Sequence, residues 1–101
     1  MDFYLMPDAV ETPAFPEELG LVFLGNLALE EFRQVERFFP KEVDYFEDFR
    51  LVLPEVEVLY TELRRSKIYE NSSNNISYIL KTEEFCKKAI AANLGIVGFS
   101  D

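Results

Sequence analysis

The chain has 101 residues, 49% of them apolar and 15% aromatic, which allows one compact core, excludes intrinsic disorder and predicts a single domain over residues 1–101. It contains no histidine and one cysteine, so an intrachain disulfide is excluded and the commonest general base and metal ligand are missing. The formal net charge of −9 at pH 7 is polarised, because residues 1–62 hold 15 acidic and 4 basic side chains whereas residues 63–101 hold 4 acidic and 6 basic ones.

The N-terminal part of the chain predicts two strands followed by a helix. Residues 2–6 are aromatic and apolar and stop at a proline, as a short strand does, and a proline-marked loop follows. The run 20–25 is bounded by glycines and fits either a buried strand or the start of a helix, and we favour the strand. Asn26 is a suitable N-cap for a helix over residues 27–39, which ends before the next proline.

Residues 44–66 carry the strongest helical period in the chain. Apolar side chains recur at helical spacing through the whole segment, across Pro54. A proline in a helix interior costs about 3 kcal/mol, so we predict either a kinked helix or two helices with Pro54 in the first turn of the second. A rival interpretation makes residues 49–53 and 56–60 strands, because their apolar side chains also alternate.

The C-terminal part predicts a strand, a helix and a further strand. Residues 70–75 are polar and turn-prone, which indicates a surface loop, and residues 76–81 then fit a strand. Thr82 is expected to cap a helix that stops at Gly95, and residues 96–99 form the last strand. This order favours a right-handed parallel crossover. The predicted elements give the α+β class, a small sheet packed against about two to four helices.

Residues with catalytic chemistry are few. Cys86 is expected in the first turn of a helix beside Lys87 and Lys88, a setting that favours a low thiol pKa, but we predict a small apolar core residue instead. No phosphate-binding loop and no EF-hand spacing occurs in the sequence. Two distant carboxylates could still serve glycoside hydrolysis, although so small a domain has little room for a sugar cleft. We therefore predict no catalytic residue, no cofactor and no metal.

The predicted helix over residues 44–66 would carry an acidic surface opposite its apolar face. At about 100° per residue its carboxylates align in one stripe, with two apolar side chains among them. The stripe consists of Asp44, Asp48, Glu55 and Glu62, with Leu51 and Val58 beside them. An apolar contact surrounded by charge is typical of protein interfaces. The predicted partner-binding residues are Glu30, Glu31, Glu36, Asp44, Tyr45, Glu47, Asp48, Leu51, Glu55, Val58 and Glu62.

In size, in charge and in its lack of catalytic chemistry, the whole chain resembles the small acidic immunity proteins that bacteria pair with contact-delivered or polymorphic toxins. The resemblance rests on these properties and on no sequence motif. It implies tight one-to-one binding that occludes the active site of a cognate toxin, often a basic nuclease whose phosphate-binding site an acidic surface can mimic. The partner expected from the resemblance is a basic toxin domain, and the expected activity is inhibition rather than catalysis.

Two other classes of protein share these features. An acidic adaptor, or a nucleic-acid mimic that blocks a DNA-binding protein, would carry the same charge, whereas a small carboxylate-dependent enzyme would need a deep pocket. The charge disfavours binding to nucleic acid and to anionic membrane surfaces. The opening segment has no basic region and a short apolar run, too short for a signal peptide or a membrane span, so we expect a cytoplasmic protein.

Overall fold

The computed structural model describes residues 1–69 and 73–100, with the side chains of this range apart from Pro16 and residues 67–76. Over these residues, one four-stranded sheet and three α-helices form one globule of 41 × 26 × 21 Å, which confirms the α+β class. The elements in chain order are β1 (Asp2–Met6), the 3₁₀ helix η1 (Pro16–Leu19), β2 (Phe23–Asn26), α1 (Leu29–Val35), the 3₁₀ helix η2 (Glu36–Phe38), β3 (Phe49–Leu51), α2 (Leu53–Tyr69), α3 (Ser73–Ala92) and β4 (Gly95–Phe99).

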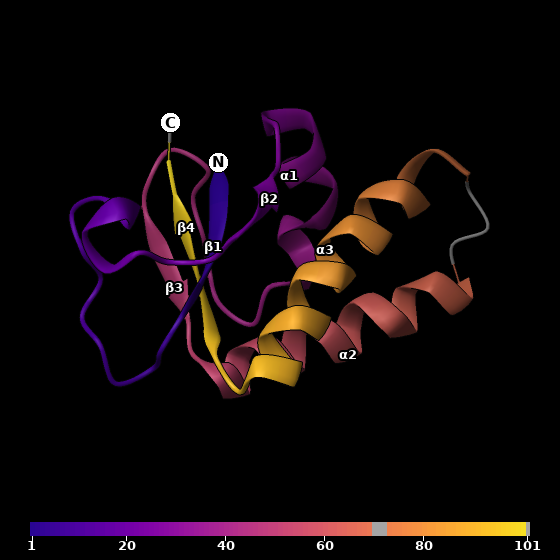
Figure 1. Ribbon diagram of the computed structural model, residues 1–101. Coiled ribbons are helices and arrows are strands. Elements are labelled where there is room, and N and C mark those ends of the chain that lie inside the picture. Colours follow the sequence, from indigo (N-terminus) through magenta and orange to yellow (C-terminus); the bar gives the residue numbers. More distant parts are fainter. Residues whose placement is uncertain (70–72, 101) are drawn as a thin grey trace.

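The sheet is antiparallel throughout, with the strand order β2-β1-β4-β3 (Figure 1). The predicted strands at residues 2–6 and 96–99 are confirmed, and β2 overlaps the strand favoured for residues 20–25. The predicted parallel crossover is wrong, because residues 76–81 belong to α3 and both neighbours of β4 run antiparallel to it.

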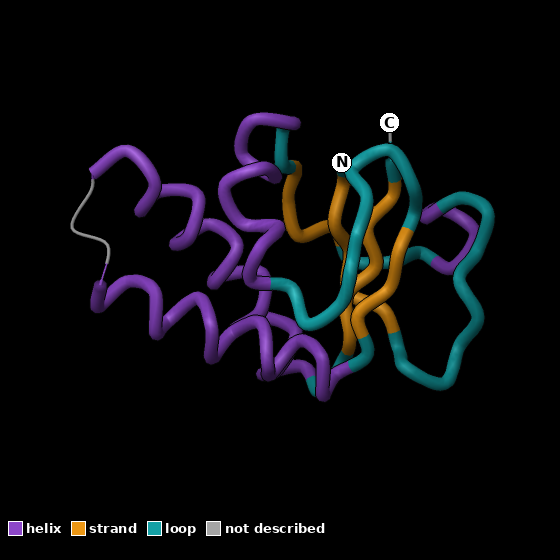
Figure 2. Tube along the Cα trace, turned by 180° about the vertical axis from the view of Figure 1, so that it is seen from behind, coloured by secondary structure: helices purple, strands orange, loops and turns teal. Residues whose placement is uncertain are grey.

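The α-helices cover one face of the sheet, and the loop between β1 and β2 lies on the other (Figure 2). Alternation along the strands matches these two faces. Phe3 and Ile96 belong to the main core under the helices, whereas Met6 and Val97 form part of a smaller cluster on the opposite face. Arg50 of β3 holds the loop in place, because its guanidinium donates to main-chain carbonyls of residues 7–10.

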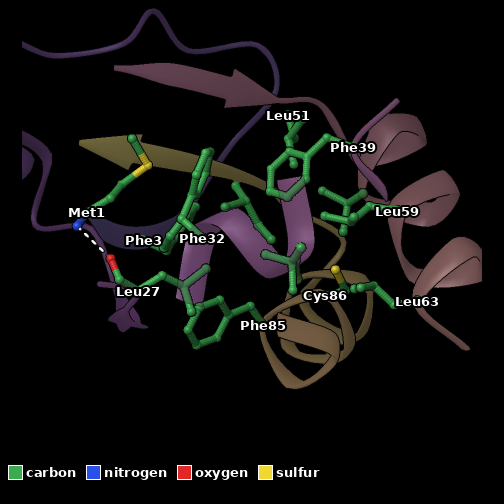
Figure 3. Packing of buried hydrophobic residues seen from close by; sticks show 14 of the residues in the cluster. Met1, Phe3, Leu27, Phe32, Phe39, Leu51, Leu59, Leu63, Phe85 and Cys86 are labelled. Carbon is green, nitrogen blue, oxygen red and sulfur yellow. Dashed lines mark hydrogen bonds between the residues drawn. The ribbon is translucent and has the colours of Figure 1, made fainter. Parts of the chain in front are cut away.

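Four phenylalanine rings pack among aliphatic side chains in the main core (Figure 3). The ring of Phe32 contacts those of Phe39, Tyr45 and Phe49, with centroids 5.5 to 6.2 Å apart. Such tilted pairs contribute about 0.5–1.5 kcal/mol each beyond the area that they bury. Gly98 in β4 leaves the space for this packing, because a Cβ there would lie 3.2 Å from a ring carbon of Phe49.

The predicted helix over residues 44–66 is wrong in its first half. Residues 44–48 are irregular, β3 follows, and α2 begins at Leu53 with Pro54 in its first turn. The two-helix alternative therefore places Pro54 correctly, but the first helix that it predicts, before Pro54, does not form. The strand alternative is right for residues 49–51 and wrong for residues 56–60, which are helical.

Two carboxylates fix the start of α2. Asp8 accepts hydrogen bonds from the Leu53 amide with both oxygens, at 2.9 and 3.1 Å, and Glu55 accepts one from the Val52 amide at 3.0 Å. Pro54 has no amide hydrogen, and the Glu55 amide donates to the Val52 carbonyl. The amide donors of residues 52–55 therefore all have partners, as a stable helix start requires.

α3 replaces the strand predicted for residues 76–81 and the helix start predicted at Thr82. The Thr82 hydroxyl donates to the Tyr78 carbonyl, one turn earlier in the same helix, at 2.9 Å. A threonine that bonds back in this way lies inside a helix and does not cap it. Of the predicted surface loop, residues 70–72 lie outside the described residues, and residues 73–75 begin α3.

Two helix ends also differ from the predicted ones. α1 begins at Leu29, and the predicted cap, Asn26, instead donates to the Asp2 carboxylate at 2.7 Å. α3 ends through Asn93, whose φ of 59° is left-handed, rather than at Gly95, which starts β4. Asparagine tolerates this conformation better than most residues, so it can end a helix as glycine does.

We expect Asp8→Ala to lower the free energy of unfolding by about 1 kcal/mol, because it removes the acceptor of the Leu53 amide. Urea denaturation followed by circular dichroism measures this change. Glu11→Ala is the matched control, since Glu11 is exposed in the same loop and no hydrogen bond to it is found among the described residues. Equal losses in the two variants would show that Asp8 does not stabilise the helix start.

Candidate functional site

A surface hollow of about 670 Å³ lies between the end of α1 and the segment that leads into β3. Half of its lining side chains are carboxylates. The lining consists of Arg33, Glu36, Glu42, Val43, Asp44, Tyr45, Phe46 and Glu47. We call it the Phe46 hollow, after its most exposed apolar residue.

A turn at residues 44–47 builds one wall of the Phe46 hollow. The Asp44 carboxylate accepts a hydrogen bond from the Phe46 amide at 2.9 Å, and the Asp44 carbonyl accepts one from the Glu47 amide at 3.2 Å. An aspartate that binds the amide two residues later is a common start for such a turn. The turn keeps Phe46 out of the core, and 66% of this side chain is exposed.

Tyr45 joins the turn to the core. Its ring centroid lies 5.5 Å from that of Phe32, and 5.2 Å from that of Phe46 with the two planes at 87°. Edge-to-face contacts of this kind have a preferred geometry. The exposed ring of Phe46 is therefore held against a partly buried one.

Negative charge surrounds Phe46. It shares the hollow with four carboxylates and with one guanidinium, that of Arg33. Arg33 Nη1 lies 3.5 Å from Oε1 of Glu36 in an exposed pair, which offsets one of the four charges. The hollow can therefore attract a cationic group and offers an apolar contact at the same place.

The Phe46 hollow brings together four of the predicted partner-binding residues, Glu36, Asp44, Tyr45 and Glu47. Val58 and Glu62 line a different and smaller hollow on α2, of about 370 Å³. Glu30 is exposed in the first turn of α1 and lines neither of them.

The predicted stripe of carboxylates does not form, because residues 44–52 are not helical. Asp48 accepts hydrogen bonds from the amide and the hydroxyl of Ser100, at 2.8 and 3.1 Å. Glu55 binds the start of α2 and forms an ion pair with Lys41 at 3.2 Å. Both carboxylates therefore stabilise the fold locally.

Two further predicted residues have contacts inside the protein. Leu51 is 1% exposed and pairs with Ile96 in the sheet, so its prediction as an apolar anchor is wrong. Glu31 accepts a hydrogen bond from the Ala28 amide at 3.0 Å and forms an ion pair with Lys81 at 3.2 Å. The bond from the Ala28 amide lowers the pKa of Glu31, and Lys81 adds to this effect against the opposing one of partial burial.

The sequence prediction missed Phe46 and Glu42. The helical period assigns Phe46 to the core together with Phe49, because positions three or four residues apart share one face of a helix. A local signal for the turn does exist in Asp44, which can bind the amide two residues on, and in the proline that precedes this charged segment. These signals are weaker than the period that they interrupt.

Cys86 lies in the core, away from the lining of the Phe46 hollow. Its side chain is fully buried, which confirms the prediction (Figure 3). Burial raises the pKa of the thiol to about 12, and the negative charge of Glu83 acts in the same direction. A thiol in this state is neither a nucleophile nor a metal ligand near neutral pH.

The described residues 1–69 and 73–100 also bear on metal binding and on membrane spanning. No group of three histidine, cysteine, aspartate or glutamate side chains in this range could hold a metal ion. Over the same residues, no helix combines the length and the hydropathy that a membrane span needs.

Comparison of the chain with protein-family models, with curated proteins and with solved structures finds no match. No relative therefore supplies a function to compare. What the Phe46 hollow does has to follow from its own residues.

We expect Cys86 of the folded protein to resist iodoacetamide at about pH 8, because its pKa of about 12 leaves almost no thiolate. In guanidinium chloride the pKa returns to about 8.5, and the thiol should react like a free one. Mass spectrometry measures both rates. Rapid alkylation of the folded protein would contradict the burial of this side chain.

The same pKa predicts how stability varies at alkaline pH. The unfolded chain loses the Cys86 proton above about pH 8.5 while the folded protein keeps it up to about pH 12, so the stability that this group contributes falls as the pH rises through that window. Cys86→Ala should remove this part of the pH dependence and cost about 1–2 kcal/mol near neutral pH. An unchanged alkaline profile would contradict the assignment.

Proposed function

We propose that the protein binds a basic protein partner and engages it through the Phe46 hollow. One observation carries this proposal: an aromatic side chain, exposed over 66% of its surface, lies among four carboxylates. An apolar contact with a charged rim is the usual anatomy of a protein interface. We infer a binding function rather than catalysis, because an exposed apolar contact with a charged rim suits binding, whereas a carboxylate-dependent enzyme needs a deep pocket.

Phe46 is suited to act as the apolar anchor. Covering a phenylalanine side chain contributes about 1.5–3 kcal/mol to binding. The bond from its amide to Asp44 and the contact with the Tyr45 ring hold it before any partner arrives. Little ordering entropy therefore opposes its burial in an interface.

The carboxylates would select the partner. Rim charges act mainly on the rate of association and on specificity, and a net charge of −9 attracts basic proteins and repels acidic ones. Glu42 and Glu47 are best placed for this role, because both are exposed and no hydrogen bond or ion pair to either carboxylate is found among the described residues.

Within this class we propose a bacterial toxin as the partner and its inhibition in the cytoplasm as the outcome. The support is the resemblance to immunity proteins in size, in charge and in the absence of histidine. A nuclease binds bases through stacking and phosphates through positive charge. An exposed ring flanked by carboxylates offers both features to such a site, so the Phe46 hollow is suited to occupy it and exclude the substrate.

The charge of the Phe46 hollow should control association. We expect the double variant Glu42→Lys, Glu47→Lys to slow association with a partner purified from the source organism while changing dissociation much less. At an ionic strength of 0.15 M, salt screens charge–charge attraction beyond about 8 Å. Raising the ionic strength to this value should therefore slow association of the unsubstituted protein in the same way. Surface plasmon resonance measures both rates.

Glu84→Lys is the control for this charge reversal, because Glu84 is exposed on α3 and lines none of the hollows described. It should change the association rate far less than the double variant does. Association that responds neither to salt nor to the double variant would contradict recognition by charge.

Phe46→Ala should reduce inhibition of the partner. If Phe46 is the anchor, the variant needs about 30-fold more protein for half-maximal inhibition, which corresponds to a loss of about 2 kcal/mol. Its unfolding free energy should stay within about 0.5 kcal/mol of the unsubstituted value, because the ring is exposed. A nuclease assay with increasing amounts of each variant measures the inhibition.

Leu80→Ala is the matched control, since Leu80 is an exposed apolar residue on α3. Equal inhibition by both variants and by the unsubstituted protein would contradict the role of Phe46 as the apolar anchor. Tight binding of a basic partner without inhibition would contradict the toxin-neutralising function and favour the alternative of an acidic adaptor or nucleic-acid mimic.

A further inference from the structure

A further hollow lies on the face of the sheet that carries the β1–β2 loop, and it shares no lining residue with the Phe46 hollow. Its volume is about 350 Å³. Three aromatic rings and three carboxylates line it, those of Tyr4, Phe15, Phe99, Asp2, Glu17 and Asp48. No lysine or arginine among the described residues takes part in the lining.

The aromatic rings of this hollow come from two paired strands and the loop beside them. Tyr4 of β1 and Phe99 of β4 lie edge to face, with ring centroids 5.8 Å apart. Phe15, just before η1, is 64% exposed. Two rings are therefore fixed in the sheet, and the third adds an open aromatic surface to which a cation can bind.

Two of the carboxylates are held in place by neutral donors. Asp2 accepts a hydrogen bond from the Asn26 side-chain amide at 2.7 Å, and Asp48 accepts one from the Ser100 main-chain amide at 2.8 Å. Both bonds use Oδ1, which leaves Oδ2 of each carboxylate for a ligand. Because the donors carry no charge, these bonds position the carboxylates without cancelling their charge.

The pKa of Tyr4 agrees with this arrangement. Burial of the phenol raises it, and the negative charges of Asp2 and Glu17 raise it further. Nearby carboxylates oppose the ionisation of a phenol. The negative charges of Asp2 and Glu17 therefore both act at the Tyr4 ring, and a cation bound there would be attracted by both.

We propose that this hollow binds an arginine side chain of a basic protein. A guanidinium can stack flat on an aromatic ring while its planar fork of donors pairs with a carboxylate. Lysine offers a point charge without that fork. A second copy of this chain is a poor occupant, because both copies carry a net charge of −9. The site requires neither the Phe46 hollow nor a toxin as partner.

The test uses N-acetyl-arginine methylamide as the probe, with the neutral citrulline analogue as its matched control. Nuclear magnetic resonance titration of the whole 101-residue chain follows main-chain and aromatic signals. We expect saturable shifts at Tyr4, Phe15 and Ser100, and none of these with the citrulline analogue. Signals of Phe46 should move much less, which separates this site from the one proposed above.

Two adjacent glutamates separate this site from a general effect of charge. Glu17 and Glu18 lie next to each other in η1, but only Glu17 lines the hollow. Glu17→Gln should weaken binding of the probe about two- to fivefold, as expected when an exposed ion pair is lost, and Glu18→Gln should leave it unchanged. Phe15→Ala should weaken it by a similar factor, through lost stacking on an exposed ring that the core does not need.

Equal effects of Glu17→Gln and Glu18→Gln would overturn the proposal, because the probe would then respond to net charge alone. Equal shifts with the citrulline analogue, or shifts that do not saturate, would also overturn it. A lysine probe that binds as tightly as the arginine probe would overturn the choice of arginine.

Discussion

The hydrogen-bonded junction between β3 and α2 joins the helices to the loop on the opposite face of the sheet. At this junction the Asp8 carboxylate accepts a hydrogen bond from the Leu53 amide. Gly95 leaves room for that carboxylate, since a Cβ at Gly95 would lie 2.6 Å from it. Asp8 belongs to the loop that covers the opposite face of the sheet, and Arg50 of β3 binds main-chain carbonyls of the same loop. A single set of contacts therefore fixes the start of α2 and the position of that loop.

Local signals explain which elements could be predicted from the sequence. The strands at residues 2–6 and 96–99 are apolar runs bounded by breakers, and such runs need no distant contact to be recognised. The helix predicted over residues 44–66 fails because Tyr45 and Phe49 satisfy its period from a loop and a strand that face the same core. What interrupts that period is the bond from Leu53 to Asp8, 45 residues earlier, which lies outside any window used to judge helical spacing.

The candidate site shows the same difference between what local sequence signals predict and what distant contacts decide. Composition is enough to predict carboxylates around an apolar residue, and four of the predicted residues do meet in the Phe46 hollow. Of the predicted apolar contacts, Leu51 is buried, and the exposed ring at the hollow is that of Phe46. The difference between these two residues depends on backbone conformation and not on residue type. In a strand Leu51 points into the core, and in a turn closed by Asp44 the ring of Phe46 points out of it.

The carboxylates of this chain divide into two groups with different physical roles. Asp8, Glu31, Asp48 and Glu55 accept hydrogen bonds from main-chain amides, so their charges stabilise helix starts or the end of β4. Charge reversal at these positions would change the fold and recognition together. Others line the Phe46 hollow and the hollow beside the β1–β2 loop, where each lies near an exposed aromatic ring, and Asp44 and Asp48 belong to both groups. Hydrogen bonds from main-chain amides thus offset part of the electrostatic self-repulsion of an acidic chain. A cationic group bound at the hollows would reduce the repulsion that remains among their carboxylates.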